Sequence, residues 1–408
     1  MKIRMYDVNF GEAIVYSEHR ATDEKLLVDC GAKYGRKGIE AANQVIGEIG
    51  GATCSLVITH FDEDHYNGII ALHDHCPIPV KFKKIYLPLY IYQGKVTKTE
   101  EVFRDSIKSL ACLAVLGRKS KLTILQKLFV TLPKMVNSVS DIQCVGYPDY
   151  FHVGGDRYDV LWPEQEIPFR HVKRSTELLR IIAGAVRGES YYERDSEAET
   201  EGAEEIDEVL ERFTQAFLRL YSYYALSADE REVYDGDEAP EDLIRAETEA
   251  YDAVMSLNVI PDKSWARRIN SISSALIKSM NECSIVLKQG ENVLALGDVS
   301  ARVIKYLRHK TARLDDSYRA VKAPHHGTKS LYYSKDIPGT QNMLISNSGT
   351  ANPGWKICEE YYNTYGTGIC ICTNNFSLRC NALQSGKTPC ARCNLRNKPP
   401  HPVREIVI

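Results

Sequence analysis

The chain has 408 residues, of which 44% are hydrophobic and 26% charged, a composition typical of globular rather than disordered proteins. This length allows two to three domain-sized units, or one domain with large insertions. The formal net charge of −3 gives no overall attraction to nucleic acid or to an anionic membrane, so a nucleic-acid contact would need a local basic patch.

Export and membrane insertion are not expected. The first 19 residues lack the apolar core of a signal peptide, and no stretch of about 18 apolar residues occurs. The 12 cysteines are therefore interpreted as reduced thiols or metal ligands, not as a disulfide framework. We expect a cytoplasmic protein with no membrane partner.

The first 90 residues are predicted to form alternating strands and helices. Apolar periodicity followed by two glycines predicts a helix over 37–49. Short runs rich in β-branched and aromatic residues predict strands at 2–8, 13–18, 25–31, 54–60 and 83–90. Later strands are expected at 142–147, 156–163, 283–290, 292–298 and 319–323, and a further helix at 300–309.

Two helical insertions are predicted to interrupt this β/α unit. The first, about 95–137, is leucine-rich and basic, and the second, 164–270, is strongly acidic. Such charge runs are usually solvated helix faces, and the alternative for the acidic one is a flap or a docking surface for a basic protein partner. The catalytic unit would then span 1–163 and 271–370, followed by a cysteine-rich tail over 371–408.

The most informative segment follows the strand at 54–60, where four potential metal ligands fall within six residues: His60, Asp62, Asp64 and His65. A lone histidine is usually structural, but alternating imidazole and carboxylate groups after a buried strand can converge on one or two cations. Two later strand ends add Asp298 in LALGDVS and the pair His325 and His326 in KAPHHGTKS. Gly327 after that pair allows close backbone approach.

These motifs resemble those of a known family. The ordered set D-V-x-x-G, VDCG, THFDEDHYNG, N-x-x-S-I-V-L, LGD and PHHGT is similar to the metallo-β-lactamase superfamily, and its closest branch is the metallo-hydrolase domain of the ComEC competence proteins. The resemblance covers 1–90, about 145–163 and 281–350. Asp62 replaces the second histidine of the usual His-x-His-x-Asp-His motif, as is common in the ComEC-like branch.

The resemblance implies an α/β fold, the αββα metallo-β-lactamase sandwich, here with helical insertions and a Cys-rich C-terminal tail. It implies that His60 and Asp62 hold one metal ion, that Asp64, His65 and His326 hold a second, and that Asp298 bridges both. Asp64 and His325 would be the catalytic residues, with His325 facing the substrate. Asp29 in VDCG would lie behind the ligands and orient one of them.

The chain departs from the family pattern at two places. The superfamily's further metal histidine between the first motif and the bridging aspartate is not evident, and His152, the nearest candidate, reads more simply as a surface residue. The ComEC-like branch often has a histidine-proline pair where this chain has TANPGWK. These gaps affect the first metal position and the orientation of the substrate.

The ligand types predict two divalent metal ions, with Zn²⁺ as the default and Mn²⁺ as a competitor. The implied activity is that of a metal-dependent hydrolase, a phosphodiesterase or nuclease in which metal-bound hydroxide attacks phosphorus. The substrate would be nucleic acid or a nucleotide-like anionic ester. The alternatives are a regulatory or binding module with little turnover, and a hydrolase of a non-phosphate ester.

The cysteine-rich tail carries a second candidate metal site. A Cys-x-x-Cys pair with further thiols nearby has the spacing of a structural zinc site. The candidate ligands are Cys372, Cys380, Cys390 and Cys393. The alternative is a set of scattered reduced thiols.

Overall fold

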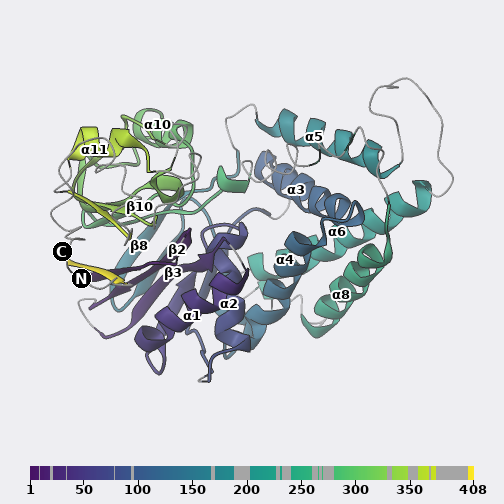
Figure 1. The fold of residues 1–408 in the computed structure, drawn as a ribbon, viewed down its shortest axis with the longest axis horizontal. Coiled ribbons are helices and arrows are strands. Elements are labelled where there is room, and N and C mark those ends of the chain that lie inside the picture. Colours follow the sequence, from purple (N-terminus) through teal and green to yellow (C-terminus); the bar gives the residue numbers. More distant parts are fainter. Residues whose placement is uncertain are drawn as a thin grey trace.

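The fold is described from a computed structural model. It covers residues 1–8, 10–18, 22–33, 35–77, 79–92, 96–166, 171–187, 203–226, 230–231, 240–259, 265, 269, 280–328, 333–347, 357–366, 369–373 and 403–408. Within these residues the chain is an α/β protein built on two mixed sheets, which confirms the predicted fold class at this level (Figure 1).

The first sheet has the strand order β14-β1-β2-β3-β4-β5-β6. Neighbouring strands are antiparallel from β14 to β3 and parallel from β3 to β6. The carboxyl ends of β3 and β4 therefore lie side by side. The strands are β1 (Lys2–Tyr6), β2 (Gly11–Ser17), β3 (Lys25–Ala32), β4 (Cys54–Val57), β5 (Ile85–Pro88), β6 (Ile142–Val145) and β14 (Val403–Val407).

The second sheet repeats this plan, with the order β13-β12-β11-β10-β9-β8-β7. Its strands are antiparallel from β7 to β10 and parallel from β10 to β13. The carboxyl ends of β10, β11 and β12 thus share one edge. The strands are β7 (Tyr150–Val153), β8 (Asp156–Trp162), β9 (Val286–Gln289), β10 (Val293–Ala295), β11 (Ser317–Lys322), β12 (Gly339–Ile345) and β13 (Cys370–Cys372).

The two sheets pack face to face, because one buried apolar cluster draws its side chains from both of them. Successive residues of a strand point to opposite faces. Ile14 and Leu26 accordingly belong to the cluster between the sheets, whereas Val15 and Leu27 belong to the larger cluster that includes the helices. The strands are thus buried on both faces, which explains their nearly continuous apolar sequences.

Helices cover the outer faces of both sheets (Figure 1). Two of them, α1 (Gly35–Ile49) and α2 (Glu63–Asp74), pack against β3. On the other side lie α10 (Ala301–His309) and α11 (Glu359–Tyr365). Short 3-10 turns are η1 (Leu132–Met135), η2 (Val139–Asp141) and η3 (Pro324–Gly327).

The two predicted insertions pack together into one helical body, which we call the helical extension (Figure 1). In it α3 packs against α5 and α6, and α6 packs against α8. The helices are α3 (Lys98–Val115), α4 (Lys119–Thr131), α5 (His171–Val186), α6 (Ala203–Ala225) and α8 (Pro240–Ser256). Much of the acidic run, residues 188–202 and 232–239, lies outside the described residues.

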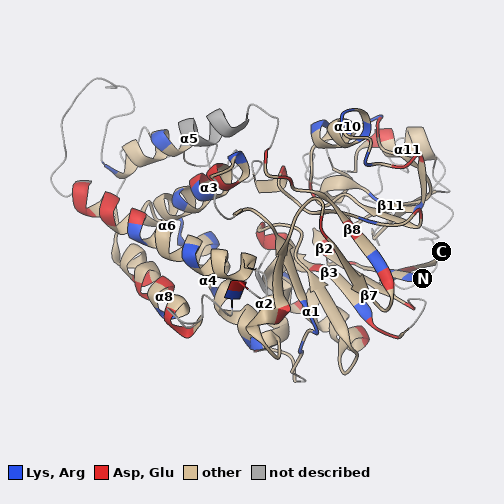
Figure 2. Cartoon of the chain, turned by 180° about the vertical axis from the view of Figure 1, so that it is seen from behind, with Lys and Arg blue, Asp and Glu red and all other residues tan. Residues whose placement is uncertain are grey.

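Basic residues lie along α3 and α4, and acidic residues along α6 and α8 (blue and red in Figure 2). Lys98 pairs with Glu166 at 3.6 Å, and Lys108 pairs with Glu211 at 2.7 Å. Some lysines of the first insertion therefore form ion pairs with other segments of the chain.

Both sheets extend into the segment that the sequence analysis assigned to the tail. The Cys370–Cys372 strand adds to β12, and the Val403–Val407 strand pairs with β1. Of the candidate zinc ligands, Cys372 is buried in its strand, while Cys380, Cys390 and Cys393 lie outside the described residues.

Among the described residues, no helix combines the length and the apolar character needed to cross a membrane.

Candidate metal centre

The predicted ligands gather where the carboxyl ends of the parallel strands of both sheets meet. His60 follows β4, His65 lies in the first turn of α2, Asp298 follows β10, and His326 lies in η3 after β11. The Asp298 Oδ2 atom lies 3.4 Å from Nε2 of His65, 3.8 Å from Nε2 of His326 and 4.0 Å from Nε2 of His60. The sequence thus located four groups that the fold brings together across 266 positions of the chain, from 60 to 326.

Among the described residues, the Nε2 atoms of His60, His65 and His326, which face Oδ2 of Asp298, are buried without a hydrogen-bond partner. The Asp298 Oδ1 atom, on the side of Lys322, is also buried without one. Leaving a buried polar atom unpaired costs about 1–3 kcal/mol, so several around one point need a shared explanation. A cation held by these atoms would supply it.

The opposite ring nitrogens of the same histidines are anchored. His65 Nδ1 lies 2.8 Å from Asp29 Oδ2, His60 Nδ1 lies 3.1 Å from the Thr59 hydroxyl, and His326 Nδ1 lies 3.2 Å from the Ser346 hydroxyl. Asp29 also accepts hydrogen bonds from the amide and hydroxyl of Thr59, both at 2.7 Å. Metal-binding histidines typically use one nitrogen for the metal and the other for such an anchor. Asp29 therefore anchors the His65 ring, and its role behind a metal ligand stays a prediction.

The backbone around the group is strained. Among the described non-glycine residues, five have positive φ, and three of them are Asp29, His325 and His326, with φ of 56°, 47° and 56°. Such conformations cost about 1–3 kcal/mol each and persist where the surroundings fix them. Gly327 follows with φ of 69°, and a Cβ atom there would lie 2.8 Å from the Ile345 side chain. Strain is thus concentrated at the turn that presents the two histidines.

The charges of the group shift its pKa values in opposite directions. Burial, with the nearby His65, lowers the pKa of His60 well below its usual value. Burial would also lower the pKa of His65, but Asp298 and Asp29 outweigh it and raise that pKa. Burial alone would raise the pKa of Asp298, yet His65, His326 and His325 hold it well below its usual value. Asp298 is therefore an anion near neutral pH, as a metal ligand must be.

The remaining predicted residues lie at different distances from the centre. Asp64 Oδ2 is 3.5 Å from His326 Nε2, which places Asp64 at the group. His325 Nε2 is 3.9 Å from Asp298 Oδ2, and its side chain is 16% exposed against 1% or less for His60 and His326. His325 is thus the most exposed histidine of the group, and the Asp64 side chain is also partly exposed, at 12%.

Asp62 points elsewhere. Its Oδ1 atom accepts the amide of Glu63 at 3.0 Å, as the N-cap of α2, and lies 3.6 Å from Lys121 Nζ. Within the described part of the chain, no histidine nitrogen lies within 4.0 Å of the Asp62 carboxylate. The structure does not place Asp62 among the four converging groups, and its role as a ligand stays a prediction.

Sequence reasoning missed a buried ion pair behind the centre. Glu12 of β2 contacts Lys322 of β11, both only 1% exposed, and Lys322 Nζ lies 3.8 Å from Asp298 Oδ1. Glu12 also accepts from the Ser346 hydroxyl at 3.0 Å and lies 3.7 Å from His326 Nδ1. The glutamate and the lysine each stand in an otherwise apolar strand. Because buried charges are rare without a partner, this pattern could have indicated a buried ion pair.

Within the described part of the chain, two sets of side chains have donor atoms close enough to share a metal ion: His60, His65 and Asp298, and Glu12, His65 and His326. The first set fits a metal better, because Asp298 Oδ2 faces the Nε2 atoms of His60 and His65, which have no hydrogen-bond partner among the described residues. In the second set Glu12 is neutralised by Lys322 and lies on the anchored side of His326. His152, the alternative histidine, lies exposed on β7.

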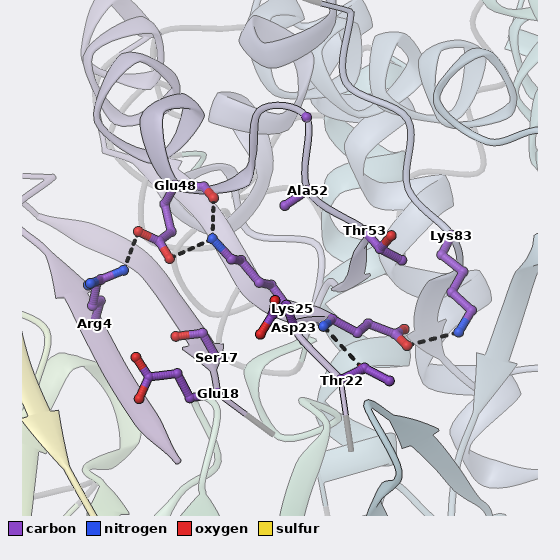
Figure 3. A pocket seen from close by; sticks show the side chains of 12 residues that line it. Arg4, Ser17, Glu18, Thr22, Asp23, Lys25, Glu48, Ala52, Thr53 and Lys83 are labelled. Carbon is purple, nitrogen blue, oxygen red and sulfur yellow. Dashed lines mark hydrogen bonds and ion pairs between the residues drawn. The ribbon is translucent and has the colours of Figure 1, made fainter. Parts of the chain in front are cut away.

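A hollow lies at the end of the first sheet opposite the candidate metal centre (Figure 3). It has a volume of about 790 Å³, and its lining includes Arg4, Lys25, Glu48 and Lys83. Glu48 contacts both Arg4 and Lys25, the latter at 2.8 Å, while Lys83 pairs with Glu24 at 2.8 Å. The three cations of the hollow are thus paired with carboxylates, and its volume alone does not identify a site.

Comparison with protein-family models, with curated proteins and with solved structures finds no match to this chain.

Proposed function

We propose that this protein is a metal-dependent hydrolase with a metallo-β-lactamase sandwich, acting on phosphodiesters. The observation that carries the proposal is the convergence of three buried histidine Nε2 atoms, none with a hydrogen-bond partner, around the anionic Asp298. This pairing of anchored Nδ1 atoms with unpartnered Nε2 atoms supports a metal centre rather than a structural network.

The arrangement of the sheets supports the αββα metallo-β-lactamase assignment. Two sheets of matching strand plan pack face to face between helices, and the proposed ligands come from the edge where parallel strands of both sheets end. This is also the edge at which open α/β sheets place their sites.

In the proposed centre, His60, His65, His326, Asp64 and Asp298 would hold two divalent ions, with Zn²⁺ favoured and Mn²⁺ as the competitor. A bound pair of ions would lower the pKa of water and neutralise charge on a phosphoryl group. Asp29, Thr59 and Ser346 keep the imidazoles oriented. His325, the most exposed histidine of the group, would donate a hydrogen bond to a substrate oxygen.

A nucleotide-sized ester fits this structure better than a long nucleic-acid track. Several basic side chains of the helical extension already contact carboxylates, including Lys98, Lys108 and Lys127. These groups are less available for the phosphate contacts that dominate nucleic-acid affinity.

A second candidate, a binding module with little turnover, is favoured by one observation. Asp62 faces Lys121 and not the histidines, so the first metal position has fewer converging ligands than the second.

The test is hydrolysis of bis(p-nitrophenyl) phosphate by metal-free protein reloaded with Zn²⁺ or Mn²⁺. Wild type is compared with the double variant Asp64→Ala/His65→Ala, and metal content is measured in the same samples. Metal-dependent turnover that the double variant loses supports the proposal. Bound metal without turnover on this ester would favour the binding module or a non-phosphate ester.

A further inference from the structure

Lys121 of the helical extension contacts the first metal motif directly. Its Nζ atom lies 3.6 Å from Asp62 Oδ1, with the lysine side chain 35% and the aspartate side chain 23% exposed. The same Oδ1 atom accepts the Glu63 amide. Both contacts hold the Asp62 carboxylate at the start of α2, whereas neighbouring Asp64 reaches to 3.5 Å from His326.

The helix that carries Lys121 is fixed against this motif by packing. Phe61, between His60 and Asp62, is 4% exposed, and its ring centre lies 5.2 Å from that of Phe129 on α4. It also contacts Phe103 of α3 and Tyr221 of α6, at ring-centre distances of 6.2 and 6.1 Å. The position of the Lys121 ammonium is therefore set by the core of the helical extension.

The surroundings of this ion pair are largely apolar. Lys121, Asp62 and Glu63 line a small hollow of about 20 Å³, and its other lining residues are Phe61, Tyr66, Leu110, Leu125 and Met280. An apolar wall reduces solvent screening, so the pair is stronger here than on an open surface.

We propose that Lys121 sets the affinity of the first metal position by competing with the metal for Asp62. The inference rests on the proposed metal-dependent function. For Asp62 to join His60 around a cation, its carboxylate must leave or share the lysine, and the ammonium also repels a nearby dication. The helical extension would thereby weaken the first position relative to the second.

A matched control is present on the same helix. Lys127 also joins α4 to α2, pairing with Asp74 at 2.5 Å, but Asp74 lies at the other end of α2 from the metal motif. Lys127→Met therefore removes an ion pair of the same kind between the same helices without touching Asp62.

The experiment is a Zn²⁺ titration of the full chain by calorimetry, with stoichiometry from native mass spectrometry. For Lys121→Met we expect the weaker zinc to bind about three- to tenfold more tightly than in wild type, because one partly exposed ion pair is removed. Lys121→Arg and Lys127→Met should bind zinc as wild type does. In an Asp62→Asn background, Lys121→Met should change nothing.

Equal zinc affinity in wild type and Lys121→Met would overturn the inference, as would an equal gain in Lys127→Met. Weaker binding in Lys121→Met would also overturn it, because Lys121 would then be assisting Asp62. If wild type binds two zinc ions and Lys121→Met makes no difference, only this inference fails. If wild type binds no zinc or Mn²⁺, the proposed function fails with it.

Discussion

The carboxyl and amino ends of β3 and β4 differ in how their charged side chains are paired. At the carboxyl end, His60, His65 and Asp298 are buried, and the Nε2 atoms of both histidines have no hydrogen-bond partner among the described residues. At the amino end, Glu48 lines a hollow of about 790 Å³ and forms ion pairs there with both Arg4 and Lys25 (Figure 3). The comparison indicates that buried polar atoms without hydrogen-bond partners identify a candidate site better than the volume of a hollow does.

Removing one charge at each end should give the largest contrast. Asp298→Asn keeps the shape of the side chain but removes the anion among the histidines, and we expect turnover of bis(p-nitrophenyl) phosphate to fall about a thousandfold or more. Glu48→Gln at the hollow should leave turnover unchanged and cost about 1 kcal/mol of stability or less. Steady-state kinetics and thermal melts check both, and full activity in Asp298→Asn would remove the basis of the comparison.

Glu247 shows what a buried carboxylate does without histidines beside it. Burial, opposed only in part by a hydrogen bond from Gln126, raises its pKa to about 7, whereas the pKa of Asp298 is lowered. A pKa raised in the folded state gives stability that is present below the unfolded value and lost as pH rises through about 7. We expect Glu247→Gln to stabilise the protein by up to about 3 kcal/mol at pH 8 and to be near neutral at pH 4.5.

Chemical denaturation of wild type and Glu247→Gln across that pH range measures this effect. Glu249→Gln, at an exposed position of the same helix, should change little at either pH. A pH-independent difference between Glu247→Gln and wild type would show that packing, not ionisation, is responsible.

Substitutions at two glycines compare the packing beside the metal centre with the packing beside the hollow. A Cβ atom on Gly31 would lie 2.5–2.6 Å from backbone atoms of Asp64, His65 and Tyr66, so Gly31→Ala must push α2 away and should cost about 1–3 kcal/mol. Gly47, next to Glu48 of the hollow, is helical with open space around it, and Gly47→Ala should gain about 0.5–1 kcal/mol. Melting temperatures should move in opposite directions, and a shared direction would contradict the packing contrast.

Of the two changes at the metal centre, the smaller effect is expected at the anchor of one ligand. Asp29→Asn can keep the hydrogen bonds to Thr59 but weakens the charged contact with His65, and we expect about tenfold weaker zinc binding. Isothermal titration measures the change. Unaltered zinc affinity would mean that the backbone alone orients His65.

The sequence predicted the elements that present the site better than the contacts around it. His60, Asp298 and His326 follow strands whose apolar patterns are local, and parallel strands bring such ends together. Asp62 belongs to the same motif, yet its position depends on Lys121, which is 59 positions away and on another helix. Motif spacing contains no information about such a partner.

The ion pair behind the centre was unpredictable for the same reason. Glu12 and Ser346 are in contact although 334 positions separate them, and Lys322 of β11 forms an ion pair with Glu12. The packing of both insertions into one helical extension likewise depends on contacts between distant segments, such as Lys108 with Glu211. Local periodicity predicted the helices but not their assembly.

The central claim is that the buried histidines and Asp298 bind divalent metal. The most direct test is Zn²⁺ stoichiometry by native mass spectrometry for wild type, His65→Ala and His152→Ala, the last at an exposed histidine on β7. The account predicts zinc bound to wild type and His152→Ala, and loss of at least one zinc in His65→Ala. No zinc or Mn²⁺ on wild type, or equal zinc on all three proteins, would contradict it.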